Sequence, residues 1–201
     1  MIFAPRWRQA PREVSHTHTE FGPPLLLAPA AQAATLERMR QWRNDGSVMA
    51  LDFESVARLS AEVARMGTQR IVFVSVTPWR DGVDDQAVVT FLRAIKALSQ
   101  SPRLHVTIVT VDALGSPATR AVTHPVDGVY IGLGQTLAKE FTDWRVDCVS
   151  LTEMSAQALQ AALDSDLSAY AGAPVVIDGD AVWSAAMTPI DLPVSDRHRG
   201  F

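Results

Sequence analysis

Short apolar runs alternate with longer segments of helical periodicity over most of this chain. The runs are expected to form strands, at residues 25–28, 48–51, 70–75, 104–109 and 146–151, of which the first is expected to be buried on both faces. The longer segments carry apolar residues three to four positions apart, as amphipathic helices do, at residues 31–42, 53–66, 88–98, 129–141 and 156–163. Strands and helices that alternate in this way are joined by right-handed crossovers. The sequence therefore predicts an α/β fold with a doubly wound, mainly parallel sheet.

The C-terminal part departs from this alternation. Residues 175–177 and 181–187 are apolar runs on either side of Asp178-Gly179-Asp180. An Asp-Gly turn between two such runs is a strong signal for a β-hairpin, so we expect one here. The chain after Pro189 is polar and typical of a linker.

The N-terminal part is rich in proline and shows no helical period. We expect it to form an extended arm with a short strand at residues 2–8, for which Trp7 is the anchor. Trp7 and Trp183 lie near the two ends of the chain and either bury one another or cap a partner surface. The predicted organisation is an N-terminal arm (1–24), an α/β unit (25–189) and a linker (190–201).

Composition excludes several classes of protein. A chain of 201 residues with 47% hydrophobic and 20% charged residues suits one globular domain. Its net charge of -4 provides no cationic field to hold nucleic acid. The lone Cys148 can form neither an internal disulfide nor a cysteine zinc site, which favours a reducing, cytoplasmic compartment. We expect neither a signal peptide nor a membrane span, because no apolar run is long enough.

A nucleotide site would require a glycine-rich turn after the first strand of the sheet. That turn reads Pro29-Ala30-Ala31-Gln32 and has no glycine, although a pyrophosphate needs close approach to the backbone. Gly132 and Gly134 lie within a helical pattern instead, so we expect them to pack closely against a neighbouring element. No dinucleotide site is predicted.

The sequence also lacks the residue spacings that known catalytic sites require. A short-chain reductase needs a tyrosine followed four residues later by lysine, but Tyr130 is followed there by Gly134 and Tyr170 by Pro174. Cys148 lies in an apolar strand, where a thiol packs as a small hydrophobe with a raised pKa.

The histidines and paired aspartates also have simple structural explanations. Two imidazoles without a third ligand do not make a selective metal site, which applies to His16 and His18. Of the other histidines, His105 lies on a strand face, His124 precedes a proline in a loop, and His198 lies near the C-terminus. Helix starts and hairpin turns favour aspartate for backbone reasons, which accounts for Asp84, Asp85, Asp178 and Asp180. We therefore predict no catalytic, cofactor-binding or metal-binding residue.

Residues 128–151 resemble a segment of the ketoreductases of modular polyketide synthases. In that family a glycine-containing helix ends in Ala-Lys-Glu and is followed by a turn, a tryptophan and a strand; here Phe141-Thr142 replaces an aromatic and a proline, and Ser150-Leu151 replaces Asp-Leu. Residues 3–7 and 178–183 resemble the family's opening strand and its Asp-Gly hairpin. The resemblance spans nearly the whole chain. It is to the N-terminal structural subdomain, and most closely to synthases whose acyltransferases act in trans.

The resemblance implies a truncated Rossmann-like fold that holds no cofactor. The NADPH loop and the catalytic Ser, Tyr and Lys or Asn belong to the family's second subdomain, which would begin just after Phe201. The chain would then be no enzyme by itself. It would stabilise the catalytic subdomain that reduces β-ketoacyl chains on an acyl carrier protein, within a cytoplasmic multienzyme of polyketide and antibiotic biosynthesis. Its partners would be that subdomain, other synthase domains and, indirectly, the carrier protein, with no nucleic acid and no membrane.

Two alternatives remain open at this stage. The chain could be a pseudo-ketoreductase scaffold that braces a neighbouring methyltransferase or dehydratase domain. It could also be a stand-alone α/β enzyme with a pocket at the carboxyl ends of its strands.

Overall fold

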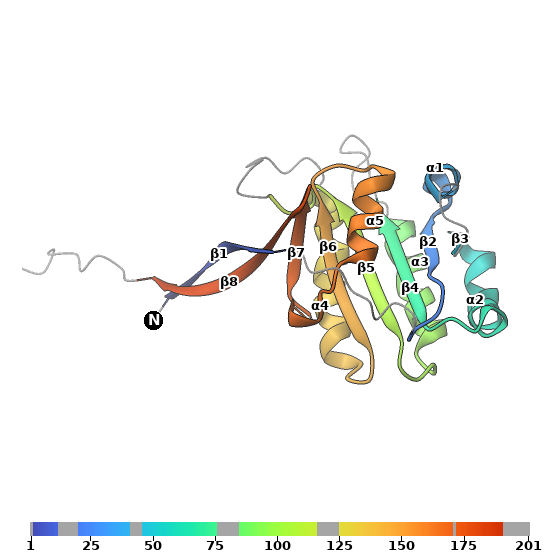
Figure 1. Cartoon of the computed structure of the whole chain (residues 1–201). Helices are drawn as coiled ribbons and strands as arrows, with labels where there is room; N and C mark the ends of the chain where they lie inside the picture. Colours follow the sequence, from blue (N-terminus) through green and yellow to red (C-terminus); the bar gives the residue numbers. More distant parts are fainter. Residues whose placement is uncertain are drawn as a thin grey trace, which may run out of the picture.

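An eight-stranded sheet runs through the molecule (Figure 1). The computed structural model describes residues 2–11, 20–40, 46–75, 85–115, 125–170 and 172–190. The strands are β1 (Ile2–Pro11), β2 (Leu25–Pro29), β3 (Ser47–Leu51), β4 (Arg70–Ser75), β5 (His105–Val111), β6 (Arg145–Leu151), β7 (Pro174–Asp178) and β8 (Ala181–Ile190). The helices are α1 (Ala30–Arg40), α2 (Phe53–Met66), α3 (Asp85–Leu98), α4 (Gly128–Glu140) and α5 (Ala156–Asp164), with short 3-10 turns at Pro125–Asp127 and Ser168–Tyr170.

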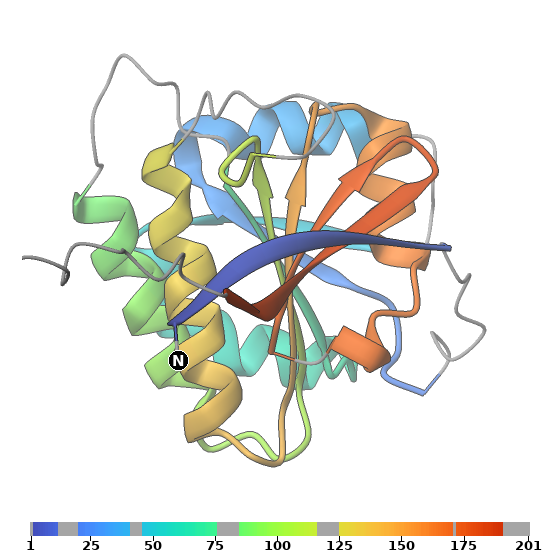
Figure 2. The same cartoon turned by 90° about the vertical axis from the view of Figure 1, so that its left-hand side faces the viewer.

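The sheet is parallel in its central part and antiparallel at one edge. Its strand order is β1-β8-β7-β6-β5-β4-β2-β3. All pairs between β7 and β3 are parallel, whereas β8 runs antiparallel to β7 and to β1. Helices α2, α3 and α4 cover one face, while α1 and α5 cover the other (Figures 1 and 2). The predicted α/β, doubly wound, mainly parallel sheet is confirmed.

Local signals explain where the best-predicted elements begin and end. Helix α2 begins after Asp52, whose carboxylate accepts a hydrogen bond from the backbone N–H of Ser55 at 2.7 Å. The Ser55 hydroxyl in turn accepts from the backbone N–H of Asp52 at 2.9 Å. This capping box satisfies two of the N–H groups that a helix start leaves unpaired. The helix ends at Gly67, whose φ of 63° suits a residue without a Cβ.

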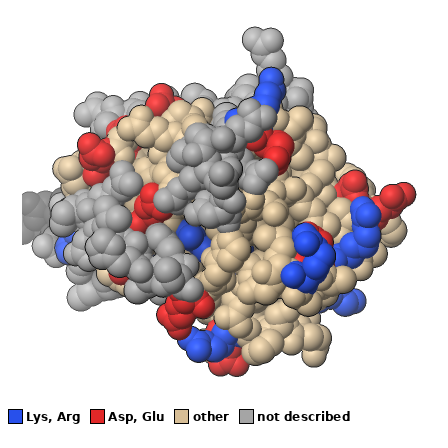
Figure 3. Space-filling model, turned by 45° about the vertical axis from the view of Figure 1, so that its right-hand side comes forward, with Lys and Arg blue, Asp and Glu red and all other residues tan. Residues whose placement is uncertain are grey.

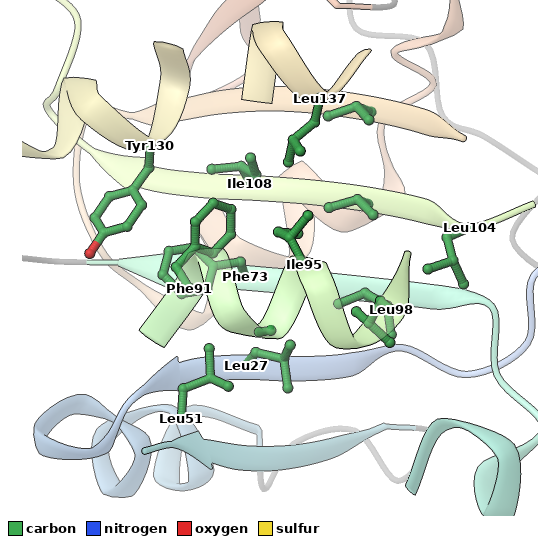
Figure 4. Close-up of a cluster of buried hydrophobic side chains, with 14 of the residues drawn as sticks. Leu27, Leu51, Phe73, Phe91, Ile95, Leu98, Leu104, Ile108, Tyr130 and Leu137 are labelled. Atoms are coloured by element: carbon green, nitrogen blue, oxygen red, sulfur yellow. The ribbon is translucent and has the colours of Figure 1, made fainter. Parts of the chain in front are cut away.

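Two apolar clusters hold the layers together, one on each face of the sheet. On the first face, the rings of Phe73, Phe91 and Tyr130 meet at centroid distances of 4.5 to 5.5 Å, surrounded by leucines and isoleucines of the sheet and helices (Figure 4). On the other face, valines of β4, β5 and β6 pack under α5. Because both faces are covered, the central strands are buried throughout.

Several boundaries differ from the sequence prediction. Strand β1 extends to Pro11 rather than Arg8, because each of its residues pairs with β8 and so belongs to the sheet. Helix α3 begins earlier than expected, at Asp85, since its polar first turn carries no apolar period. The predicted end of the first helix at Trp42 and the predicted linker after Ile190 lie outside the described residues.

Candidate functional site

The carboxyl ends of the parallel strands are where sheets of this kind bind ligands. The strand order reverses between β2 and β4, so a nucleotide would be expected at the turn after β2. There Pro29 ends the strand and Ala30 begins α1. No residue separates the two elements, and no glycine-bearing loop exists at this point to surround a phosphate. The residues at this turn do not fit a dinucleotide cofactor.

Two serine side chains at this edge form hydrogen bonds within the chain. The hydroxyl of Ser150, at the end of β6, accepts from the backbone N–H of Ala113 at 3.1 Å and of Leu114 at 3.3 Å. The Ser75 hydroxyl, at the end of β4, donates to the fully buried carboxylate of Asp127 at 3.1 Å. These side chains attach the segments after β5 and before α4 to the sheet.

A hollow of about 520 Å³ lies at the same edge, between the ends of β6 and β7 and the start of α5. Its lining includes the carboxylates of Glu153, Asp178 and Asp180, and none of its described lining residues is basic. The Asp178 carboxylate accepts a hydrogen bond from the Thr152 hydroxyl at 3.2 Å. A negatively lined hollow repels phosphates, so it does not suit NADPH either.

A buried ion pair lies at the opposite, amino end of the strands. The Nε2 atom of His105, the first residue of β5, lies 2.7 Å from an Oδ atom of Asp147 in the neighbouring strand β6. Their side chains are 8% and 3% exposed. The Arg145 guanidinium lies 3.1 Å from the same carboxylate and 3.4 Å from Asp166, and the ring of Phe21 packs edge-on against His105.

Electrostatics keep this carboxylate ionised. Burial raises the pKa of Asp147, but the hydrogen bond and positive charge of His105, together with Arg145, outweigh burial and hold that pKa below its usual value. The Thr107 hydroxyl lies 3.5 Å from the same Nε2 atom that contacts Asp147. A catalytic triad uses both imidazole nitrogens and an accessible nucleophile, an arrangement that this buried cluster does not have. The cluster joins β5, β6 and the Phe21 segment.

Sequence reasoning missed this cluster. The sequence placed His105 on a strand face without a partner, but His105 and Thr107 are both buried. The signal that could have found it is Asp147, a charged residue inside an otherwise apolar strand, which requires a buried partner.

The other residues considered from the sequence have structural positions where the structure describes them. Cys148 is 1% exposed, and burial, aided by the neighbouring Asp147 charge, raises the pKa of its thiol to about 12. Tyr130 belongs to the aromatic cluster, and Tyr170 ends a 3-10 turn. The described part of the chain contains no group of three or more His, Cys, Asp or Glu side chains able to hold a metal ion. The remaining candidates lie outside the described residues: His16, His18, Asp84, His124 and His198.

The two helix glycines differ from each other. A Cβ on Gly134 would lie 2.5 Å from the Cys148 sulfur and 2.7 Å from an Ile108 methyl carbon, so the predicted close packing is confirmed at this position. A Cβ on Gly132 would have no atom within 4 Å, and the same prediction is wrong there. The first glycine of the pair faces outward, whereas the second faces the sheet.

The surface shows no large patch of a single charge on the face in Figure 3, where acidic and basic side chains are mixed. In the part of the chain that the structure describes, no helix is long and apolar enough to cross a membrane.

No protein-family model and no curated protein matches the sequence. Solved structures do. The structure of an A1-type ketoreductase matches with a TM-score of 0.71 and 15% sequence identity, and the match covers 96% of this chain and 43% of that chain. The structure of A-type ketoreductases from a modular polyketide synthase matches with a TM-score of 0.69 and 14% identity, and covers 96% of this chain and 44% of that chain. The first ketoreductase of the tylosin polyketide synthase matches with 0.60 at 20% identity over 92% and 41%. The chain has a ketoreductase-like fold. It spans less than half the length of these ketoreductase chains.

Proposed function

We propose that this chain is the noncatalytic structural subdomain of a polyketide synthase ketoreductase. Its task is to pack against the NADPH-dependent catalytic subdomain and stabilise it. The observation that carries this proposal is the asymmetry of the structural match, because 96% of this chain corresponds to only 43% of an A1-type ketoreductase. Features of the carboxyl edge support it: Ser75 and Ser150 attach neighbouring segments to the sheet there, and the junction of Pro29 with Ala30 has no glycine-bearing loop for a phosphate.

The β1–β8 ribbon is the surface that we assign to this partner. Strand β7 pairs only with Ala181–Ser184 of β8, whereas β1 pairs with β8 over its whole length. The outer half of the ribbon is therefore two-stranded and projects past the sheet (Figures 1 and 2). An isolated two-stranded ribbon is marginally stable in water, and β1 is an edge strand able to accept a further strand. A second subdomain that packs on this ribbon would be positioned by it.

In this proposal the reduction of β-ketoacyl chains is the work of the partner. NADPH would supply the hydride there, and the acyl carrier protein would dock on the catalytic half within a cytoplasmic synthase. This chain would contribute rigidity: the His105–Asp147 pair and the capped helices fix the sheet, and the sheet fixes the ribbon.

The first experiment is an immunoblot of source cells with an antibody against this chain. A band of several hundred kilodaltons supports a synthase subdomain, whereas a band near 21.8 kDa contradicts it. In a large polypeptide, the sequence after residue 201 separates the remaining readings. A glycine-rich loop with Ser and Tyr supports the ketoreductase scaffold, and its absence favours a pseudo-ketoreductase that braces a neighbouring domain.

A second experiment titrates the purified chain with NADPH and follows nucleotide fluorescence. We expect no binding and no NADPH oxidation with a β-ketoacyl thioester. Saturable binding, or loss of absorbance that depends on the thioester, would overturn the noncatalytic assignment and favour a stand-alone enzyme.

A further inference from the structure

Helix α3 presents an apolar stripe to solvent. The described residues include four large apolar side chains that are exposed, and two of them, Val89 at 40% and Leu92 at 44%, lie on this helix. Asp85 and Lys96 extend the same stripe, because positions three or four apart share one helix face. All of these side chains point away from Phe91 and Ile95, which fill the core beneath them.

The order of residues along this stripe is symmetric. It runs acid, apolar, apolar, base, and its midpoint lies between Val89 and Leu92, with the charged residues equally far from that point. If a second α3 lay antiparallel to the first across a two-fold axis at the midpoint, Val89 of each copy would meet Leu92 of the other. Asp85 of each copy would then meet Lys96 of the other. Such self-complementarity is what a two-fold interface between identical chains requires.

Neither charge of the stripe forms an ion pair within the part of the chain that the structure describes. Asp85 and Lys96 are both exposed, and neither makes an ion pair with another residue of the described ranges. The contrast is with Arg93 on the same helix, whose guanidinium lies 4.5 Å from the ring centroid of Phe53 and so covers that exposed ring. Val89 and Leu92 have no such cover.

We propose that two copies of this chain associate through α3, antiparallel about a two-fold axis between Val89 and Leu92. This inference goes beyond the proposed function, because it uses a different surface. Helix α3 contacts α2 and β3, near one end of the strand order, whereas the β1–β8 ribbon forms the other end. A copy docked on α3 therefore leaves the ribbon accessible.

The contact is a single pair of helices and buries little area, which is typical of weak, reversible association. We expect a concentration-dependent dimer with a dissociation constant of roughly 10 μM to 1 mM. Because each ion pair occurs twice in a two-fold interface, one substitution changes two contacts. Reversal of one charge should weaken association about tenfold or more and invert its dependence on salt, because like charges then face each other.

Sedimentation of the whole chain over a range of concentrations tests the arrangement. Asp85→Lys and Lys96→Asp should each weaken self-association, and the double variant should restore it. An equimolar mixture of the two single variants should form a mixed dimer more tightly than either variant dimerises alone. Gln86→Lys is the control, since it introduces a lysine in the same turn but off the stripe, and it should leave association nearly unchanged.

Leu92→Ser tests the apolar part of the contact. It should abolish association with little change in thermal stability, because Leu92 is nearly half exposed in the single chain. A chain that stays monomeric throughout the concentration range overturns the proposal. So does a double variant, or a mixture of single variants, that fails to recover association while each variant keeps its thermal midpoint. If Leu92→Ser instead weakens only the contact with a catalytic subdomain, the stripe belongs to that partner and the proposal is wrong, whatever the immunoblot shows.

Discussion

Replacement of Gly134 by alanine should destabilise the chain, although alanine is the better helix former. The added Cβ would lie 2.5 Å from the Cys148 sulfur and 2.7 Å from the Ile108 Cδ1 atom, far inside ordinary contact distance. Both neighbours are buried in the sheet, at 1% and 0% exposure, so neither can move outward. Helix α4 would have to shift away from β5 and β6.

The magnitude follows from two opposing contributions. Overpacking of a close-packed core costs about 1–3 kcal/mol, and two contacts at this site favour the upper end of that range. The higher helix propensity of alanine returns about 1 kcal/mol. We expect Gly134→Ala to lower the free energy of unfolding by about 1–2 kcal/mol. Gly132→Ala, on the same helix, meets no atom within 4 Å and should raise it by about 0.5–1 kcal/mol.

Urea unfolding followed by tryptophan fluorescence measures both variants under the same conditions. Ile108→Val, which removes the Cδ1 atom, should recover part of the loss when it is combined with Gly134→Ala. If the two alanine variants prove equally stable, or if Ile108→Val brings no recovery, the steric explanation is wrong.

Three further results are expected. Burial raises the pKa of Asp147, but His105 and Arg145 lower it further, so this pKa is below its usual value in the folded chain. The Asp147 carboxylate therefore stabilises the fold above the unfolded pKa near 3.8, and this stabilisation is lost as the pH falls through the folded pKa. The difference in unfolding free energy between the wild type and Asp147→Asn should thus be largest near neutral pH and shrink below about pH 4. An equal difference near neutral pH and below pH 4 would contradict the lowered pKa of Asp147. The Cys148 thiol, with a pKa of about 12, should resist iodoacetamide at pH 8 until denaturant is added, and labelling of the folded chain would show that β6 is not buried. Ser155→Ala removes the acceptor for the Ala158 N–H, 3.0 Å away, and should cost about 1 kcal/mol in thermal unfolding, with Ser155→Gly costing less.

The sequence predicted the elements whose signals are local. Strand β4 and helix α2 have the expected bounds, because residues within or next to each element determine its ends: a run of β-branched residues in β4, and an apolar stripe that ends at Gly67 in α2. The Asp-Gly hairpin was equally clear, with Gly179 at a φ of 56°. Strand β1 was predicted too short, since its length is set by β8, a partner that lies far away in the chain.

The short junction between β2 and α1, which has no glycine, was also readable from the sequence, because it depends on consecutive residues. The His105–Asp147 pair was not, since it depends on which strands become neighbours and in which register. In the register of β5 with β6, His105 lies opposite Arg145, and Thr107 lies opposite Asp147. The imidazole therefore reaches its carboxylate diagonally across the ladder, a relation that no spacing within one segment can reveal.

The pairing of β1 with β8 has a consequence for the order of events during synthesis. Ile2 lies opposite Ile190, so β1 leaves the ribosome before the other seven strands of this sheet and must wait for β8 before it can join them. Meanwhile β2 to β7 can pair and bury their apolar clusters, and the ribbon closes only after the whole sheet exists. During this interval β1 is an unpaired strand beside a growing nascent chain.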